Sequence, residues 1–266
     1  MRVRTPGPVL PLSLLAAALL TALVGLAVTP SSGATPATPA APPAAASRFT
    51  STLGLGDSVP AGFGCGCTPY VGLLSAQHGA AQHQPMTVQN LARGGLTSAG
   101  LLQQVASRGV VAGPGAVTVI TIGANDFDSG SLSSPGCRAA DGLACYAPQL
   151  QALDDHVRRT LRLLGSAGER RGPVLVTGYW NVFLDGPRAQ AKGPAYTRDS
   201  DVLTRQVNDV LEQAACDSGA TYVDLYAPFK SRGEALSDLL APDGDHPSAA
   251  GHRLIADLLE DSLTRS

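Results

Sequence analysis

Short apolar runs alternate with helical patterns through most of this chain. Five runs are rich in β-branched and other apolar residues and predict buried strands at 52–56, 86–91, 116–122, 173–177 and 221–225. Apolar side chains recur at helical spacing in 70–77, 97–107, 148–164, 201–215 and 248–263. Strands that alternate with helices form βαβ units, so we expect an α/β fold with a mainly parallel, five-stranded sheet covered by helices on both faces.

Two connecting segments are longer than such units require. Residues 128–147 are polar and rich in Ser and Gly, and residues 181–198 contain Pro187, Gly193 and Pro194. Long connections are often functional. We interpret both as loops that form opposite walls of a substrate cleft; the alternative is ordinary surface decoration.

The first fifty residues differ in composition from the rest. Arg2 and Arg4 precede a nearly continuous apolar stretch at 9–28, and small residues follow, which predicts a secretory signal peptide over 1–33. About 20 apolar residues would also span a bilayer, so an uncleaved membrane anchor is the alternative. Residues 34–50 are an Ala/Pro-rich linker, and 51–266 form one domain. We expect a secreted protein without stable membrane insertion after cleavage.

The charge of the chain argues against polyanionic partners. The formal net charge is −2, and removal of residues 1–33 takes away two arginines and no acid, which leaves −4. No Lys/Arg cluster compensates for this charge. We therefore expect no nucleic-acid partner, and we expect a monomer.

Five cysteines are informative in an exported chain, because disulfides persist in oxidising compartments. Cys137 and Cys145 flank a Gly-containing loop and are the predicted pair. Cys65 and Cys67 pair either with each other or, one of them, with Cys216. Cys-x-Cys without a second pair of ligands is poor support for zinc, so we predict no metal and no cofactor.

Ser58 is the candidate nucleophile. It follows the first predicted strand in the turn Gly56-Asp57-Ser58, a place exposed enough for attack on a carbonyl carbon. The tripeptide alone is more typical of an ordinary turn. Asp57 is interpreted as scaffold that bonds loop amides.

His246 is the candidate base. Asp243 lies three residues before it and would bind one ring nitrogen, which leaves the other nitrogen to face Ser58. Asp245 is the rival partner, but adjacent side chains point in different directions. The other histidines (His78, His83, His156 and His252) are interpreted as non-catalytic.

Three groups are candidate donors to an oxyanion. Asn125 comes directly after the third strand, Gly95 offers a backbone N–H in the loop after the second, and Ser58 offers its own N–H. Asp126 is a second scaffold residue. Because sites in parallel sheets gather at the carboxyl ends of the strands, we expect these groups to converge.

The four blocks resemble those of the SGNH hydrolases, also called the GDSL esterase/lipase family. The matching residues are Gly56-Asp57-Ser58-Val59, Asn90-Leu91-Ala92-Arg93-Gly94-Gly95, Gly123-Ala124-Asn125-Asp126 and Asp243-Gly244-Asp245-His246. The fourth letter of the first block, Val59, departs from the family, which has Leu there, and the adjacent Gly94 is the alternative to Gly95 in the second block. The resemblance implies a flavodoxin-like three-layer α/β/α fold, a metal-free Ser–His–Asp mechanism, and a Cys137–Cys145 disulfide as in secreted actinobacterial members.

The first functional hypothesis is a secreted esterase or lipase that hydrolyses small-molecule, lipid or acylated-glycan esters. An acyltransferase or deacetylase with the same residues is the second. A non-catalytic cell-wall-binding protein is the third, although every catalytic position is occupied. A metal-dependent phosphoesterase would need more histidines at ligand spacing.

Overall fold

The computed structural model describes residues 49–108, 112–165, 172–231 and 236–265. The chain divides into two units, Met1–Ala45 and Ala46–Ser266, and every described residue belongs to the second. The predicted signal peptide and almost all of the predicted linker lie outside the described residues. Among the described helices, none is both long and apolar enough to cross a membrane.

Five parallel strands form one sheet in the order β2-β1-β3-β4-β5. Their bounds are Ser51–Gly56 (β1), Thr87–Asn90 (β2), Ala116–Thr121 (β3), Val174–Thr177 (β4) and Thr221–Val223 (β5). The predicted parallel sheet is therefore confirmed. The order reverses beside β1, and this switch point is where open α/β sheets place their ligands.

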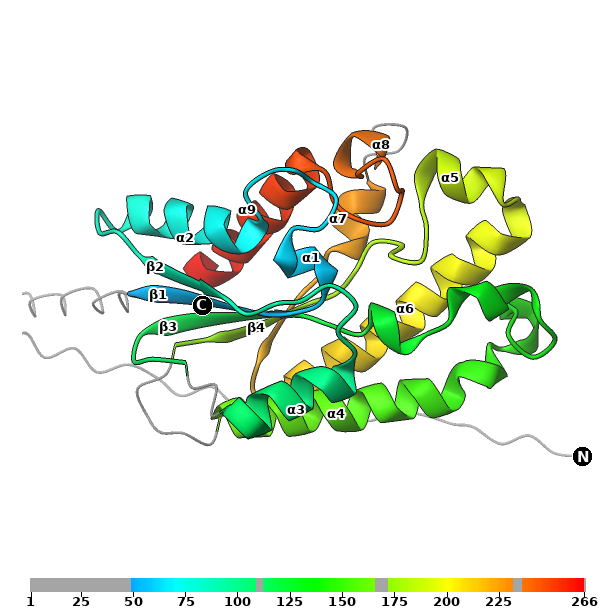
Figure 1. Ribbon diagram of the computed structural model, residues 1–266, viewed down its shortest axis with the longest axis horizontal. Coiled ribbons are helices and arrows are strands. Elements are labelled where there is room, and N and C mark those ends of the chain that lie inside the picture. The colour runs from blue at the N-terminus through cyan, green and yellow to red at the C-terminus, as the bar shows by residue number, and fades with distance from the viewer. Residues whose placement is uncertain (1–48, 109–111, 166–171, 232–235, 266) are drawn as a thin grey trace, which may run out of the picture. The chain divides into compact units, whose positions relative to one another are not determined.

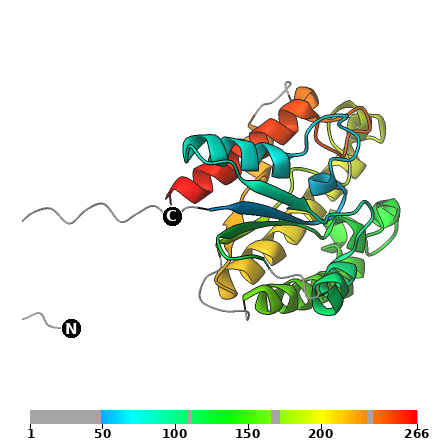
Figure 2. The ribbon, with the colours of Figure 1, turned by 60° about the vertical axis from the view of Figure 1, so that its left-hand side comes forward.

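Helices cover both faces of the sheet. α2 (Tyr70–Ala81) and α9 (Ala249–Arg265) pack together on one face, whereas α3 (Ser98–Arg108), α4 (Ala147–Gly165) and α6 (Pro194–Asp217) cover the other (Figures 1 and 2). The shorter helices are α1 (Ser58–Ala61), α5 (Gly186–Ala191), α7 (Tyr226–Lys230) and α8 (Leu236–Leu239). This is the expected three-layer α/β/α arrangement.

The central strand β3 and the edge strand β2 differ in how far their residues are buried. All six residues of β3 are buried, because this strand has a neighbour on each side and helices on both faces. All four residues of β2 are exposed, because it lies at the edge of the sheet. β2 is also shorter than the predicted range 86–91.

The predicted loop 181–198 is partly wrong, because it contains α5 and the first turns of α6. Asp185 accepts a hydrogen bond from the N–H of Gly186 and thereby caps α5. Pro194 stands in the first turn of α6, directly after Gly193. The N–H groups in the first turn of a helix have no partner within the helix, so a proline, which lacks an N–H, is tolerated there. Here Gly-Pro therefore starts a helix and does not interrupt one.

The predicted loop 128–147 contains only short 3₁₀ turns, at Ser129–Ser133, Ala139–Asp141 and Ala144–Tyr146, before α4 begins. Its cysteines, Cys137 and Cys145, are joined, with Cα atoms 5.1 Å apart. Leu132 and Leu143 are buried beneath it. The segment is therefore packed onto the domain by its own side chains.

Candidate active site

Ser58 is the first residue of α1, immediately after β1. Asp57 caps this short helix by accepting a hydrogen bond from the N–H of Val59 at 2.9 Å. Gly56 makes the sharp exit from the strand, with φ +125°; a Cβ there would lie 1.8 Å from the carbonyl oxygen of Thr121. Only glycine fits this turn, and the turn places Ser58 two residues beyond the carboxyl end of β1.

His246 meets Ser58 from the other end of the chain. Its Nε2 lies 2.8 Å from Oγ of Ser58. The loop that carries His246 is held on both sides, because its carbonyl accepts from the N–H of Ala241 at 2.7 Å and Ser248 caps α9. A base within hydrogen-bond reach of a serine is the arrangement that activates this nucleophile.

Two carboxylates lie near Nδ1 of His246. Oδ2 of Asp243 is 2.9 Å away with hydrogen-bond geometry, and Asp243 also accepts from the backbone N–H groups of Asp245 and His246. Oδ1 of Asp245 is closer, at 2.7 Å, yet it is buried and accepts no hydrogen bond in the described structure. We assign the orienting role to Asp243, because distance and direction are both favourable there.

The electrostatics of this group favour a charged imidazole. Burial acts to lower the pKa of His246, but the carboxylates of Asp245 and Asp243 outweigh it and raise the pKa above 6.5. Burial acts to raise the pKa of Asp243, but the hydrogen bonds from His246 and Asp245 outweigh it and lower the pKa to about 2. Asp243 is therefore ionised at neutral pH, and its negative charge favours the protonated form of the neighbouring imidazole.

The candidate oxyanion donors line the same cleft. Ser58, Gly94, Gly95, Asn125 and His246 all contribute to a hollow of 530 Å³. Nδ2 of Asn125 donates to the carbonyl oxygen of Leu96 at 3.1 Å, so in the free protein this amide links the two donor loops.

Asp57 lies behind the nucleophile and is fully buried. It accepts a hydrogen bond from the hydroxyl of Tyr179 at 2.5 Å, and that hydroxyl accepts in turn from the N–H of Ala124 at 3.3 Å. Burial raises the pKa of Asp57 to about 6, although the bonds from Tyr179 and Val59 act to lower it. This network joins the first and third blocks beneath the cleft, which agrees with a scaffold role.

Asp126 ties the third block to the start of α3, just after the second block. Its two oxygens accept from the N–H of Ser98 at 2.9 Å and from the Ser98 hydroxyl at 2.7 Å. Nδ1 of His156, from α4, lies 2.9 Å from the same hydroxyl. The loop with Gly95 is thus fixed to the loop with Asn125.

Aromatic and aliphatic side chains form the rest of the cleft. Phe63, Phe127, Val182 and Phe183 line it, and the rings of Phe127 and Phe183 meet edge to face at 5.9 Å. Val182 and Phe183 come from the second predicted wall, whereas the first wall contributes Ser129. Two larger hollows, of 640 and 720 Å³, lie elsewhere and contain no Ser–His pair.

Two groups of described residues bring three potential metal ligands within 4.8 Å of one another. In Asp243, Asp245 and His246, both imidazole nitrogens already face hydrogen-bond partners. In Cys65, Cys67 and His252, the two cysteines are joined to each other. Cys216 is exposed and free, so the alternative pairing with Cys216 is absent from the described structure.

Sequence reasoning missed four residues of this site: Phe63, Ser98, His156 and Tyr179. Tyr179 lies just beyond the carboxyl end of β4. Its position in the sequence could have placed it at the site, because sites in parallel sheets form at the carboxyl ends of the strands. His156 lies in the predicted helix 148–164 and is among the histidines that the sequence gives no reason to place at the site. Nothing in the sequence shows that this helix passes beside Ser98.

Comparisons with known proteins agree with this geometry. The model of the GDSL-like lipase/acylhydrolase family matches residues 55–254. The comparison with curated proteins found no match.

Several solved structures share the fold. One is the lipase Lip_vut3 from a goat rumen metagenome, with a TM-score of 0.62 and 20% identity over 80% of this chain and 97% of that one. Another is phospholipase A1 from Streptomyces albidoflavus NA297, with a TM-score of 0.59 and 22% identity over 80% and 99%. A third is the acetylxylan esterase Axe2 from Geobacillus stearothermophilus, with a TM-score of 0.54 and 20% identity over 81% and 94%.

Proposed function

Because this chain belongs to the GDSL-like lipase/acylhydrolase family, we propose that it hydrolyses carboxylic esters with Ser58 as nucleophile, His246 as base and Asp243 as the orienting carboxylate. One observation carries the proposal. Oγ of Ser58 lies 2.8 Å from Nε2 of His246, whose Nδ1 lies 2.9 Å from Asp243. This is the hydrogen-bond sequence that serine hydrolases of unrelated folds share.

The first half of the reaction forms an acyl-enzyme. Nε2 of His246 takes the proton of Ser58 as Oγ attacks the carbonyl carbon, and the imidazolium then gives this proton to the leaving alkoxide. Asp243 stabilises the imidazolium through Nδ1. In the second half, His246 activates a water, which attacks the acyl group and restores the serine.

The negative charge of the tetrahedral intermediate needs donors on the other side of the cleft. We assign this role to the N–H groups of Ser58 and Gly95 and to Nδ2 of Asn125. Each such donor contributes roughly 3 kcal/mol to transition-state stabilisation. Asn125 would exchange its bond to Leu96 for the oxyanion, so part of its contribution offsets the lost bond.

The cleft also bears on the substrate. Its apolar side chains, Phe63, Phe127, Val182 and Phe183, favour an acyl chain over a strongly polar group. The similar structures are described as a lipase, a phospholipase A1 and an acetylxylan esterase. We propose a lipid ester or an acylated glycan as substrate class, and transfer to an acceptor hydroxyl as the alternative to hydrolysis.

We further propose that the protein acts outside the cell after removal of residues 1–33. The basic start, the apolar stretch and the small residues that follow support export. Export into an oxidising compartment is also compatible with the joined cysteines.

A panel of esters of increasing acyl length tests the activity. Ser58→Ala should lower kcat by about 10⁴-fold or more, because no other group supplies the nucleophile. Ser107→Ala is the matched control, since this exposed serine of α3 bonds only its own helix. Added alcohols distinguish transfer from hydrolysis by the product formed. A folded Ser58→Ala chain with undiminished turnover contradicts the mechanism.

A further inference from the structure

The Cys65–Cys67 disulfide lies in the loop between α1 and α2, close to the candidate active site. It closes a ring around a single residue, Gly66, which is exposed and has no heavy atom within 4 Å of the place where a Cβ would stand. Both cysteines are half-buried. A small thiol can therefore approach this disulfide from solvent.

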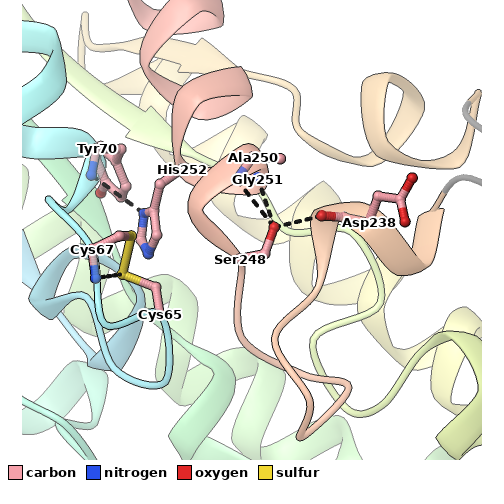
Figure 3. Close-up of a disulfide and its surroundings, with 8 residues drawn as sticks. All are labelled: Cys65, Cys67, Tyr70, Asp238, Ser248, Ala250, Gly251 and His252. Atoms are coloured by element: carbon pink, nitrogen blue, oxygen red, sulfur yellow. Dashed lines mark hydrogen bonds between the residues drawn. A yellow bond between two sulfur atoms is a disulfide. The ribbon is translucent and has the colours of Figure 1, made fainter.

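His252, from α9, lies behind the disulfide. A ring nitrogen of His252 and the two sulfur atoms all lie within 4.8 Å of one another. The side chain is completely buried, and its Nδ1 accepts a hydrogen bond from the N–H of Tyr70 at 3.3 Å. Figure 3 shows the other nitrogen, Nε2, on the ring edge that faces the disulfide.

The bond from Tyr70 determines where the proton of this ring resides. Burial, together with the nearby His246, lowers the pKa of His252 to about 4, so the ring is neutral near pH 7 and carries one N–H. Since Nδ1 accepts from Tyr70, that N–H is at Nε2. Nε2 is buried and has no hydrogen-bond partner in the described structure.

A buried N–H donor without a partner is unusual, because it has lost its hydrogen bonds to water and gained none in the protein. Here it faces two sulfur atoms that are weak acceptors while they are joined. A thiolate is a much stronger acceptor. The same tautomer disfavours a metal at these residues, because the nitrogen that faces the sulfurs carries a proton.

A second hydrogen-bond donor lies within the small loop that the disulfide closes. The N–H of Cys67 donates to Sγ of Cys65 at 3.1 Å. If the disulfide opens with Cys65 as leaving group, the Cys65 thiolate can accept hydrogen bonds from two nearby donors, the N–H of Cys67 and the Nε2–H of His252. Stabilising the leaving thiolate speeds thiol–disulfide exchange.

We propose that Cys65–Cys67 is an exchangeable disulfide, a site of modification by low-molecular-weight thiols in which His252 acts as a positioning donor. An external thiolate attacks Sγ of Cys67, the Cys65–Cys67 bond breaks, and Cys65 leaves as a thiolate beside His252. A second external thiolate attacks the mixed disulfide, which releases the oxidised thiol and the Cys67 thiolate. Two electrons enter the protein, and the two thiolates can then take protons from water.

Two residues next to the disulfide, Gly64 and Phe63, contact the proposed triad. Gly64, directly before Cys65, packs against the orienting carboxylate: a Cβ there would lie 3.0 Å from Oδ2 of Asp243. The ring of Phe63 lies 4.8 Å from the ring of His246. Opening the disulfide loosens this loop, so we expect ester hydrolysis to fall. This consequence rests on the proposed function, whereas the exchange itself does not.

The second disulfide is an internal control. Cys137–Cys145 closes a longer loop, and Cys137 is only 6% exposed. No histidine is grouped with its sulfur atoms in the described part of the chain. The full chain is incubated with glutathione without denaturant, trapped with iodoacetamide at intervals and analysed by peptide mass spectrometry. Mixed disulfide or alkylation should appear at Cys65 and Cys67 at least about 10-fold faster than at Cys137 and Cys145.

Two substitutions test the donor. His252→Gln keeps an N–H at this position and should stay within about 3-fold of the unmodified chain, whereas His252→Leu removes it and should slow exchange by about 10-fold. Equal rates at the two disulfides overturn the proposal, and so does a folded His252→Leu chain that exchanges as fast as the original. If neither variant folds, the comparison of the two disulfides decides alone.

Ester hydrolysis supplies an independent readout. Activity should fall as Cys65 and Cys67 are modified, and a chain with Cys65→Ala and Cys67→Ala should show no response to glutathione. Loss of activity without modification of these cysteines contradicts the coupling to the triad. A chain that exchanges as expected but hydrolyses no ester contradicts the proposed function only.

Discussion

His246 has two carboxylates at one nitrogen, and the roles of these neighbours can be separated. Asp243 accepts three hydrogen bonds and is held in place, whereas Asp245 approaches Nδ1 without a favourable direction. Both raise the pKa of the imidazole against the effect of burial. Only the neutral ring can accept the proton of Ser58, so activity should rise with pH through a midpoint above 6.5.

Asp243→Asn should change both the rate and the pH profile. With this charge removed, burial has more influence, so the midpoint should move to lower pH; kcat should fall by about 10²- to 10⁴-fold, because the imidazolium and its tautomer lose their partner. Asp245→Asn is the matched control and should move the midpoint in the same direction with a smaller loss of kcat. Steady-state kinetics between pH 5 and 9 measure both effects. A greater loss with Asp245→Asn would reverse our assignment of the orienting residue.

At the scale of elements, the site is assembled from the carboxyl ends of β1, β2 and β3 and from the loop before α9. Hydrogen bonds join the segments around the first three blocks: Asp57 bonds through Tyr179 to Ala124, and Asp126 accepts from Ser98 at the start of α3. Asn90 adds a third link by donating to the carbonyl oxygen of Pro60 at 2.7 Å. The polar residues of the four blocks therefore serve mainly to position a few reacting atoms.

Ser98→Ala tests one of these links. It leaves the hydroxyl partners, Asp126 and His156, with one bond fewer, which costs about 1–3 kcal/mol of the free energy of unfolding, and it loosens the loop of Gly95. We therefore expect kcat to fall together with stability. Thr97→Ala is the control: it removes the bond from the Gly100 N–H that caps α3 and costs about 1 kcal/mol, but it does not contact Asp126. Urea unfolding and ester kinetics compare the two, and an equal kcat in both variants contradicts the positioning role.

Elements whose pattern lies in their own residues could be predicted from the sequence, whereas those that depend on the chain that follows could not. β3 consists of apolar and β-branched residues throughout and α4 is apolar on one face, so both were predictable from the sequence pattern alone. The start of α6 was not, because Gly193 and Pro194 are typical of a loop and only the helix that follows shows their role.

Candidate site residues show the same division. Ser58, Asp243 and His246 stand in short motifs at predicted strand or helix ends, and the structure brings them into contact. Tyr179, Ser98 and His252 contact the site or its neighbouring loop only through tertiary packing. No motif in the sequence marks these residues, and their contacts form only when the domain folds.

At the scale of the whole molecule, the unit Ala46–Ser266 contains every strand of the sheet and every residue of the cleft. β1 is central to the site, because it pairs with β2 on one side and β3 on the other and ends at Gly56, two residues before Ser58. The site therefore requires an intact β1.

A chain that begins at residue 46 should accordingly retain both stability and activity. We expect its melting temperature to match that of the full chain within about 2 °C and its kcat/KM to match within about 2-fold, because the sheet, its helices and the cleft all belong to the compact unit Ala46–Ser266. A chain that begins at residue 54 is the control. It loses the first half of a central strand and should fail to unfold cooperatively in calorimetry. A large loss of kcat/KM in the chain from residue 46 would mean that the N-terminal segment contributes to the site, and the proposed catalytic unit would then have to extend beyond the sheet and its helices.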